Sequence, residues 1–186
     1  DMLKYNIPSN SDYYVFYPIV NGVKIEEEEL KENYNMSWRY LITNKKKLSN
    51  RKMVKDKKWW FPVNLRNPNE LFGPKIVTPH LVLLPKFSVD IQGKYSVSHS
   101  PFIFHKFGQD TEVLFFLAAI LNSSIGGWLL STHSDKYSKG YARLEVKTLR
   151  SIPIPDPSKV EKEVFNKIIR LVKQKLVNKN TNIDTD

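Results

Sequence analysis

The first third of the chain alternates between a strand pattern and helical patterns. Residues 13–20 are aromatic and β-branched, and the Asn-Gly pair that follows them is a strong signal for a two-residue hairpin turn. Apolar positions resume over residues 23–25, so we expect a β-hairpin there. Residues 26–33 are acidic and favour a short helix, and the next helix is predicted to open near residue 36 and run towards residue 51.

The middle of the chain has the alternation that is typical of β-strands. Residues 75–79 and 81–84 predict strand segments interrupted by prolines. Residues 87–98 alternate on either side of a Gln-Gly-Lys turn, which predicts a second hairpin. Residues 101–107 predict a further apolar strand.

The last third is helical by its apolar spacing. Residues 113–121 form an apolar run that is too short to span a bilayer, which needs about 20 residues, so we expect a buried helix. Ser123 or Ser124 is placed to cap a second short helix. Apolar residues between 164 and 176 recur with the helical period and predict an amphipathic final helix.

This order of elements predicts an α+β fold. Strand patterns come first with helices inserted among them, and helices gather towards the end. We expect a mixed, mostly antiparallel sheet with inserted helices, a helical hairpin and a C-terminal helix. A chain of 186 residues is long enough to bury its own core, and we expect one domain over residues 1–178 followed by a polar tail over residues 179–186.

The charge pattern indicates a polyanionic partner. The formal net charge is +10, and lysines and arginines concentrate over residues 45–58, directly before Trp59 and Trp60. Such residues neutralise phosphates and release counterions, so we interpret the run as a DNA-binding segment. The alternative is a solvated helix face. For the two tryptophans we favour a core position over base stacking, because aromatic side chains are usually buried.

Further basic residues lie at predicted loops and strand ends, where recognition residues usually sit. Arginine can read guanine through paired hydrogen bonds, whereas lysine mostly contacts phosphate. We therefore expect Arg66 or Arg143 to contact bases and the lysines to contact the backbone. The predicted DNA-binding set is Lys46, Arg51, Lys52, Lys58, Arg66, Lys75, Lys94, Lys136, Lys139 and Arg143.

Catalytic motifs are weak. Asp135 followed by Glu145 and Lys147 fits a loose nuclease pattern in which carboxylates hold magnesium, but a chain rich in lysine and glutamate matches it easily by chance. The four histidines lack the spacing of metal ligands. Asn67-Pro68 continues into Asn69-Glu70 rather than into the aromatic ring that stacks on a flipped base. We therefore predict that this chain has no catalytic centre and binds no cofactor or metal.

The cysteine content and the first residues of the chain bear on its cellular compartment. The chain contains no cysteine, so it has no disulfide and no thiolate metal site. Its first residues lack the apolar core of a signal peptide. We expect a cytoplasmic protein without a membrane partner.

An ordered set of short motifs points to a known family. The motifs are Trp38-Arg39-Tyr40-Leu41, Leu48-Ser49-Asn50-Arg51, Trp59-Trp60, Arg66, Lys75-Ile76-Val77-Thr78-Pro79, Phe87-Ser88-Val89-Asp90, Gly93-Lys94-Tyr95, Leu121-Asn122-Ser123 and Ile152-Pro153-Ile154-Pro155. This order resembles the TaqI-like C-terminal specificity domain of adenine-specific DNA methyltransferases, including fused restriction–methylation enzymes. The resemblance covers about residues 13–175. From their own chemistry, we expect Asn122-Ser123 and the Ile-Pro-Ile-Pro segment to be structural rather than DNA contacts.

The resemblance implies a division of labour. An N-terminal methyltransferase domain of the same polypeptide would bind S-adenosylmethionine and methylate a flipped adenine, and a nuclease could share that polypeptide. This chain would read the double-stranded DNA sequence in restriction–modification or phage defence. Because the sequence starts at Asp1 without a methionine and lacks catalytic motifs, we expect a fragment of a larger enzyme. Two alternatives stay open: a type I-like specificity module with a separate methyltransferase subunit, and a protein-interaction domain that binds no DNA.

Overall fold

The computed structural model describes residues 4–5, 14–52, 58–62, 67–96, 102–104 and 111–181, with backbone only at 69, 102, 104 and 177–181. The chain divides into two compact units. Unit 1 comprises Asp1–Ser11 and Asn69–Asp186, and unit 2 comprises Asp12–Pro68. Unit 2 is therefore an insertion in the sequence of unit 1, and a single domain over residues 1–178 stays a prediction.

Unit 2 opens with the predicted hairpin. Strands β1 (Ile19–Val20) and β2 (Val23–Lys24) pair antiparallel. Asn21 and Gly22 both have positive φ, 50° and 78°, as the tight hairpin turn requires. Three helices follow: α1 (Glu27–Asn33), α2 (Asn35–Thr43) and α3 (Lys45–Ser49). The single helix predicted towards residue 51 is thus two helices, because the backbone leaves the helical conformation at Asn44.

The core of unit 2 is small and aromatic. Ile25, Leu30, Leu41 and Trp60 are buried, and Trp38, Trp59 and Phe61 are among the side chains that pack against them. Trp60 is only 2% exposed, which confirms its expected core position. The Trp38 and Trp59 rings lie 5.8 Å apart, a separation at which tilted aromatic pairs attract.

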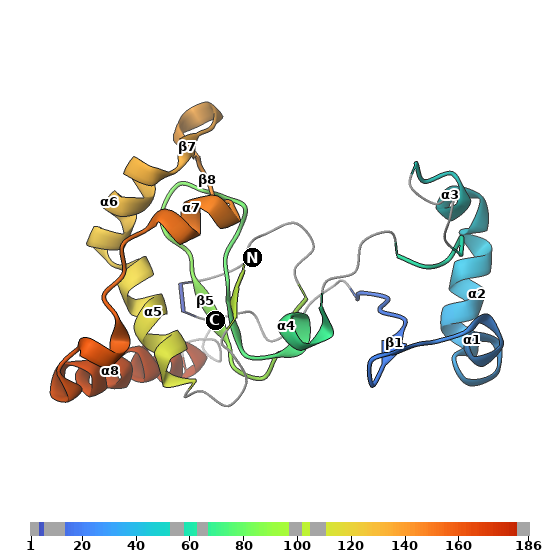
Figure 1. Cartoon of the computed structure of the whole chain (residues 1–186), viewed down its shortest axis with the longest axis horizontal. Helices are drawn as coiled ribbons and strands as arrows, with labels where there is room; N and C mark the ends of the chain where they lie inside the picture. The colour runs from blue at the N-terminus through green and yellow to red at the C-terminus, as the bar shows by residue number, and fades with distance from the viewer. Residues whose placement is uncertain are drawn as a thin grey trace. The chain divides into compact units, whose positions relative to one another are not determined.

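Unit 1 is built on an antiparallel sheet with β3 in the centre (Figure 1). Strand β3 (Lys75–Val77) pairs on one side with β5 (Ser88–Asp90) and on the other with β6 (Phe102–Phe104). Helix α4 (Pro68–Phe72) precedes β3. The amino-terminal segment extends the sheet at β5: the Tyr5 N–H donates to the Phe87 carbonyl at 2.9 Å, and the Tyr5 carbonyl accepts from Val89 at 3.3 Å.

The predicted second hairpin is wrong in its described part. Tyr95 and Ser96 lie outside any strand, and residues 97–98 fall outside the described residues. The Asp90 carboxylate accepts hydrogen bonds from the backbone N–H groups of Lys94, at 3.1 Å, and Tyr95, at 3.0 Å. These bonds turn the chain away from β5, whose free edge is taken instead by Tyr5.

Helices cover the sheet of unit 1 and confirm the α+β class. They are α5 (Glu112–Asn122), α6 (Ser124–His133), α7 (Val146–Ser151) and α8 (Lys162–Thr181), with a 3-10 turn η2 at Pro157–Lys159. Helix α8 packs on α5, where the Phe116 and Phe165 rings lie 5.2 Å apart. In the described part of the chain, no single helix is long and apolar enough to cross a membrane; α5 and α6 reach that composition only as a pair bent by 73°.

A second antiparallel sheet lies at the end of α6. Its strands are short and ordered β4 (Leu81–Val82), β8 (Ala142–Arg143) and β7 (Asp135–Lys136). One hydrophobic core joins the parts of unit 1; it includes Ile76, Val82, Phe87, Leu114, Leu121, Leu130, Leu144 and Ile152. Val82 and Leu144 tie the small sheet to this core, so the small sheet is anchored rather than free.

Asn122 joins the helices to the large sheet. Its buried amide accepts from the Phe87 N–H at 3.0 Å and donates to the Phe87 carbonyl at 2.8 Å. Ser123 then caps α6 through its Oγ, which accepts from the Gly126 N–H at 3.1 Å. The expected structural role of Asn122-Ser123 is therefore confirmed, and of the two proposed caps Ser123 is the one used.

A buried ion pair crosses the large sheet. The Lys75 ammonium is fully buried and lies 2.8 Å from the Asp90 carboxylate, which is also buried. Lys75 and Asp90 face each other in the register of β3 and β5. Asp90 therefore serves both this pair and the turn at Lys94.

Replacing Asn122 with alanine will destabilise unit 1. The variant leaves the buried Phe87 N–H without its acceptor, and an unsatisfied buried group costs about 1–3 kcal/mol. We expect urea denaturation to show a loss of about 2–3 kcal/mol in the free energy of unfolding. Asn166→Ala, at an exposed position of α8, is the matched control. Equal stability of the two variants would contradict the bridging role.

Replacing Lys75 with methionine will destabilise unit 1 without a direct effect on ligand binding. Removing one partner of a buried pair leaves an uncompensated charge and costs about 3–5 kcal/mol. Thermal unfolding followed by circular dichroism measures the loss, and Lys86→Met, at an exposed lysine of the same unit, serves as the reference. A Lys75→Met protein as stable as the reference would argue against the pair.

Candidate nucleic-acid interface

A short hairpin at the end of α6 carries three of the predicted DNA-binding residues. We call residues 135–143 the basic arm; it contains β7, the 3-10 turn η1 (Ser138–Gly140) and β8. Asp135 faces Arg143 and Lys136 faces Ala142 in the antiparallel register. The turn is tight because Lys139 and Gly140 adopt positive φ angles of 60° and 80°. Figure 1 places the arm at the end of unit 1 opposite α8.

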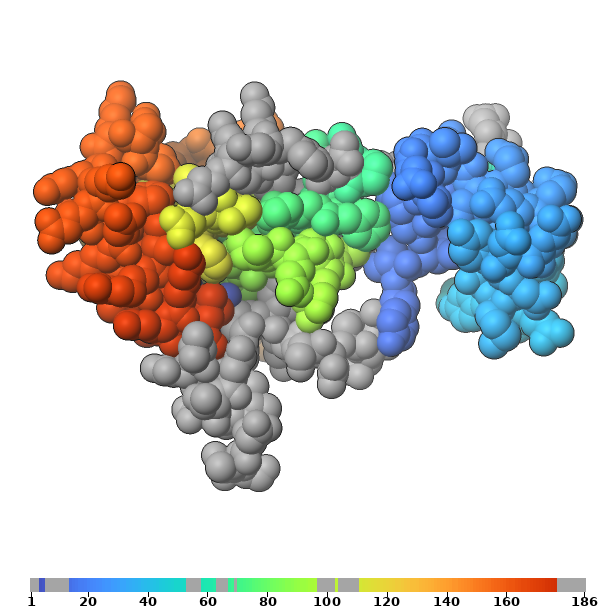
Figure 2. Space-filling model, turned by 90° about the horizontal axis from the view of Figure 1, so that it is seen from below, coloured from blue at the N-terminus to red at the C-terminus, as the bar shows by residue number. Residues whose placement is uncertain are grey.

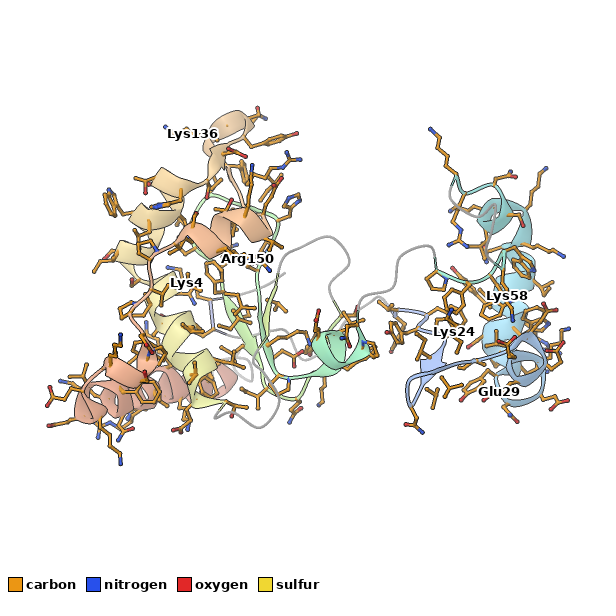
Figure 3. The ribbon with its side chains drawn as sticks, in the orientation of Figure 1. Lys4, Lys24, Glu29, Lys58, Lys136 and Arg150 are labelled. Atoms are coloured by element: carbon orange, nitrogen blue, oxygen red, sulfur yellow. The ribbon has the colours of Figure 1, made fainter. Side chains whose placement is uncertain are left out.

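The arm is exposed and positively charged. The side chains of Lys136, Lys139 and Arg143 are all exposed, and Figure 3 shows Lys136 at the outer end of unit 1. A residue that the sequence reasoning missed stands among them: Tyr137 is 53% exposed. The Arg143 guanidinium lies 6.0 Å from the Tyr137 ring centroid and its Nε lies 3.5 Å from the Glu145 carboxylate. Two contacts therefore hold the guanidinium on the arm surface.

Tyr137 could have been found from its surroundings in the sequence. It lies between two lysines in Lys-Tyr-Ser-Lys-Gly-Tyr, and a ring between cations is the arrangement that nucleic-acid-binding surfaces use for stacking. The sequence does not distinguish Tyr137 from Tyr141, however, and only the structure shows that Tyr137 is exposed whereas Tyr141 is half-buried.

The residues of the loose nuclease pattern do come together, but around a lysine. The Lys147 ammonium lies 3.1 Å from the Asp135 carboxylate and 3.9 Å from that of Glu145. The hydrogen bond to Asp135, reinforced by the charges of Asp135 and Glu145, raises the pKa of Lys147 and so favours its charged form. Among the described residues, no three acidic, histidine or cysteine side chains are grouped to hold a metal ion.

The basic run of unit 2 separates into exposed and engaged residues. Lys46 and Lys52 are exposed, and neither forms an ion pair within the part of the chain that the structure describes. Lys58 pairs with Glu26, and its ammonium lies 5.6 Å from the Trp60 ring centroid. The Lys24 ammonium lies 5.4 Å from the Phe61 ring centroid, and Figure 3 labels both lysines in this unit. Lys46 and Lys52 are thus the most available cations of the predicted set in unit 2.

Arg51 has a structural role that the sequence did not reveal. Its Nε donates to the Leu48 carbonyl at 2.8 Å, and its Nη2 donates to the carbonyls of Trp59, at 2.7 Å, and Phe61, at 3.1 Å. The guanidinium therefore ties the end of α3 to the aromatic segment of the core. Arg51 belongs to the predicted DNA-binding set, and these three hydrogen bonds engage its guanidinium within unit 2.

The remaining predicted residues are scattered. Lys75 departs from the prediction, because its ammonium is fully buried and bound to Asp90 and cannot reach a phosphate in this structure. Lys94 is exposed. It follows Gly93, where only glycine fits, because φ is 65° and an added Cβ would lie 1.7 Å from the Phe72 carbonyl oxygen. Arg66 lies outside the described residues. Among the described residues of the predicted set, the structure thus brings Lys136, Lys139 and Arg143 together on the basic arm.

Comparison with known proteins identifies the family of this chain. No curated protein matches the chain at a significant level. The family model described as the TaqI-like C-terminal specificity domain matches residues 17–154. The match covers more than half of the chain, begins in unit 2, contains the whole basic arm and ends before α8. The chain therefore belongs to the family of TaqI-like C-terminal specificity domains.

Proposed function

We propose that this chain recognises a specific sequence in double-stranded DNA for an adenine methyltransferase of a restriction–modification system. A methyltransferase domain of the same polypeptide would bind S-adenosylmethionine and carry out the reaction, and this chain would hold the DNA. The observation that carries the proposal is the basic arm, which carries three exposed cations and an exposed tyrosine whose ring lies beside Arg143. Membership of a specificity-domain family supports it.

The arm offers two kinds of contact. Lys136 and Lys139 are compact charges on a flexible stem, suited to phosphates, which position a protein on the duplex without reading its sequence. Arg143 presents a planar fork that can bind guanine through two hydrogen bonds. Because Tyr137 and Glu145 already hold the guanidinium, less side-chain entropy is lost when it binds. Arg143 is therefore our candidate for base recognition.

The cations of α3 and the segment after it supply further phosphate contacts in the proposal. Lys46 and Lys52 are exposed and lie outside the ion pairs that engage Lys31 and Lys58. Each phosphate that a lysine neutralises releases condensed counterions, so these residues add affinity that is independent of sequence and falls with salt.

A protein-interaction role is a second candidate, and one observation favours it. Helix α8 lies outside the family match and forms a broad outer face of unit 1 (Figure 2). Val164 and Leu171, one on each of two turns of that helix, are 45% and 52% exposed. An exposed apolar stripe on a helix is a common docking surface. A chain that bound a protein partner but no DNA at low salt would favour this candidate.

Neutralising the basic arm will weaken DNA binding and flatten its salt dependence. In the triple variant Lys136→Gln, Lys139→Gln, Arg143→Gln, the slope of log K against log salt should fall by about 0.9 for each phosphate that the arm no longer neutralises. Fluorescence anisotropy with a labelled duplex at several salt concentrations measures both quantities.

The matched control for the arm variant carries the same charge change on α8. Lys162, Lys167 and Arg170 are exposed, and their replacement by glutamine removes three charges from the same unit. The arm variant should lose more affinity than the control. Equal losses would show that only net charge matters and would remove the arm from the interface, whereas flat binding by the unaltered chain across salt would contradict DNA recognition altogether.

Arg143→Lys will separate base reading from charge. The variant keeps the charge but loses the paired hydrogen bonds, so it should retain binding to random duplex while losing about 1–3 kcal/mol of discrimination at one base pair. The preferred site is first selected from a pool of random duplexes, and each base pair is then varied in turn. A uniform loss at every position would assign Arg143 to a phosphate instead.

A further inference from the structure

A cavity of about 290 Å³ lies against the basic arm. Its walls come from α6, from the arm and from the segment that follows β4. Such a volume is near the lower end for ligand pockets, about 300 Å³, so the cavity suits a small group. The tight turn at Lys139 and Gly140 returns the chain so that Gly140 and Tyr141 form part of the wall.

The lining combines an apolar surface with a few polar groups. Leu83, Leu84 and Pro85 form one wall, and Leu83 and Leu84 are 59% and 67% exposed. Ser134 also lines the cavity, and its Oγ is buried without a hydrogen-bond partner within the described residues. A buried hydroxyl without a partner is unfavourable. A ligand that hydrogen-bonds the Ser134 Oγ, once the side chain rotates towards the cavity, would remove this cost.

The arm places a positive charge at the same cavity. Lys136 belongs both to the arm and to the lining, and its side chain is exposed. An apolar wall for a flat ring, a hydroxyl for its polar edge and a lysine for a phosphate together match one chemical unit. That unit is a nucleotide, since unstacked bases are bound between apolar side chains and read along their hydrogen-bonding edge.

We propose that this cavity binds a single unstacked nucleotide, with the base against Leu83 and Leu84, its edge at the Ser134 hydroxyl and its phosphate at Lys136. The proposal rests on the proposed function if the nucleotide belongs to DNA, and the same chemistry would accept a free nucleotide. A protein with such a site holds the opened duplex and so offsets part of the cost of unstacking a base.

The test compares two duplexes that differ in one extrahelical base. One labelled duplex is fully paired, and the other carries a single unpaired nucleotide at its centre, prepared with each of the four bases. The whole chain should bind at least one bulged duplex about tenfold more tightly than the paired duplex, because the unpaired base is already free of much of the unstacking cost. Fluorescence anisotropy at low salt measures both affinities.

Two variants of α6 locate the effect. Ser131 is exposed, lines the cavity, and its hydroxyl bonds only within its own helix to the Trp128 carbonyl, so Ser131→Phe should occlude the cavity without disturbing the core. Thr132 is exposed on the same helix and does not line the cavity, so Thr132→Phe is the matched control. The preference for the bulged duplex should vanish in Ser131→Phe and persist in Thr132→Phe.

A third variant tests the polar group alone. Ser134→Ala removes the hydroxyl with little change of shape, and it should reduce the preference several-fold and alter which bulged base is bound best. Circular dichroism of each variant establishes that it is folded. A preference for the bulged duplex that survives in both Ser131→Phe and Ser134→Ala would overturn the site.

Free nucleotides distinguish the two sources of the ligand. Each deoxynucleoside monophosphate is titrated against the unaltered chain and against Ser131→Phe. Saturable binding that is lost in the variant, with equal affinity for the two duplexes, would support the site and assign it to a free nucleotide. Equal affinity for the duplexes without nucleotide binding would overturn the proposal while leaving DNA recognition intact. Failure of both duplexes to bind would instead contradict the proposed function.

Discussion

The structure of unit 1 depends on the contact between one side-chain amide and one backbone position. Asn122, at the end of α5, bonds both the N–H and the carbonyl of Phe87, at the start of β5. The same carbonyl accepts the Tyr5 N–H, so helix, sheet and amino-terminal segment meet at a single residue. Buried backbone groups must be paired, and a bidentate amide pairs both groups of Phe87 while fixing the separation of the two layers.

The position of the basic arm follows from this contact. Ser123 caps α6 directly after Asn122, and Gly126 allows the close turn, because a Cβ there would lie 2.3 Å from the Ile120 carbonyl oxygen. Helix α6 then leads into the arm, and β8 pairs with β4 on its far side. The exposed cations Lys136, Lys139 and Arg143 are therefore carried by a short hairpin that is anchored at both ends. In the proposed DNA complex, such anchoring would limit the entropy lost on binding.

The cations of this chain fall into two groups, those bound inside the fold and those exposed on its surface. The net charge alone does not distinguish the two groups. Arg51 and Lys75 satisfy carbonyls and a carboxylate inside the fold, and Lys147 lies between Asp135 and Glu145. Lys136, Lys139 and Arg143 are displayed on one element instead. The net charge thus indicates a polyanionic partner, but only the surroundings of each cation decide which of them can meet a phosphate.

Local patterns in the sequence determined several of the elements of this protein and its family. The Asn-Gly turn, the apolar helix before Asn122, the cap at Ser123 and the core position of Trp60 all follow from short-range chemistry, and the order of motifs identified the family. Tertiary structure decided the rest. Tyr5, distant in sequence, occupies the edge expected to pair with residues 95–98, Lys75 faces Asp90 across two strands, and Tyr137 is exposed beside Arg143. Each depends on which segments meet in space, and a pattern of local periodicity carries no information about such partners.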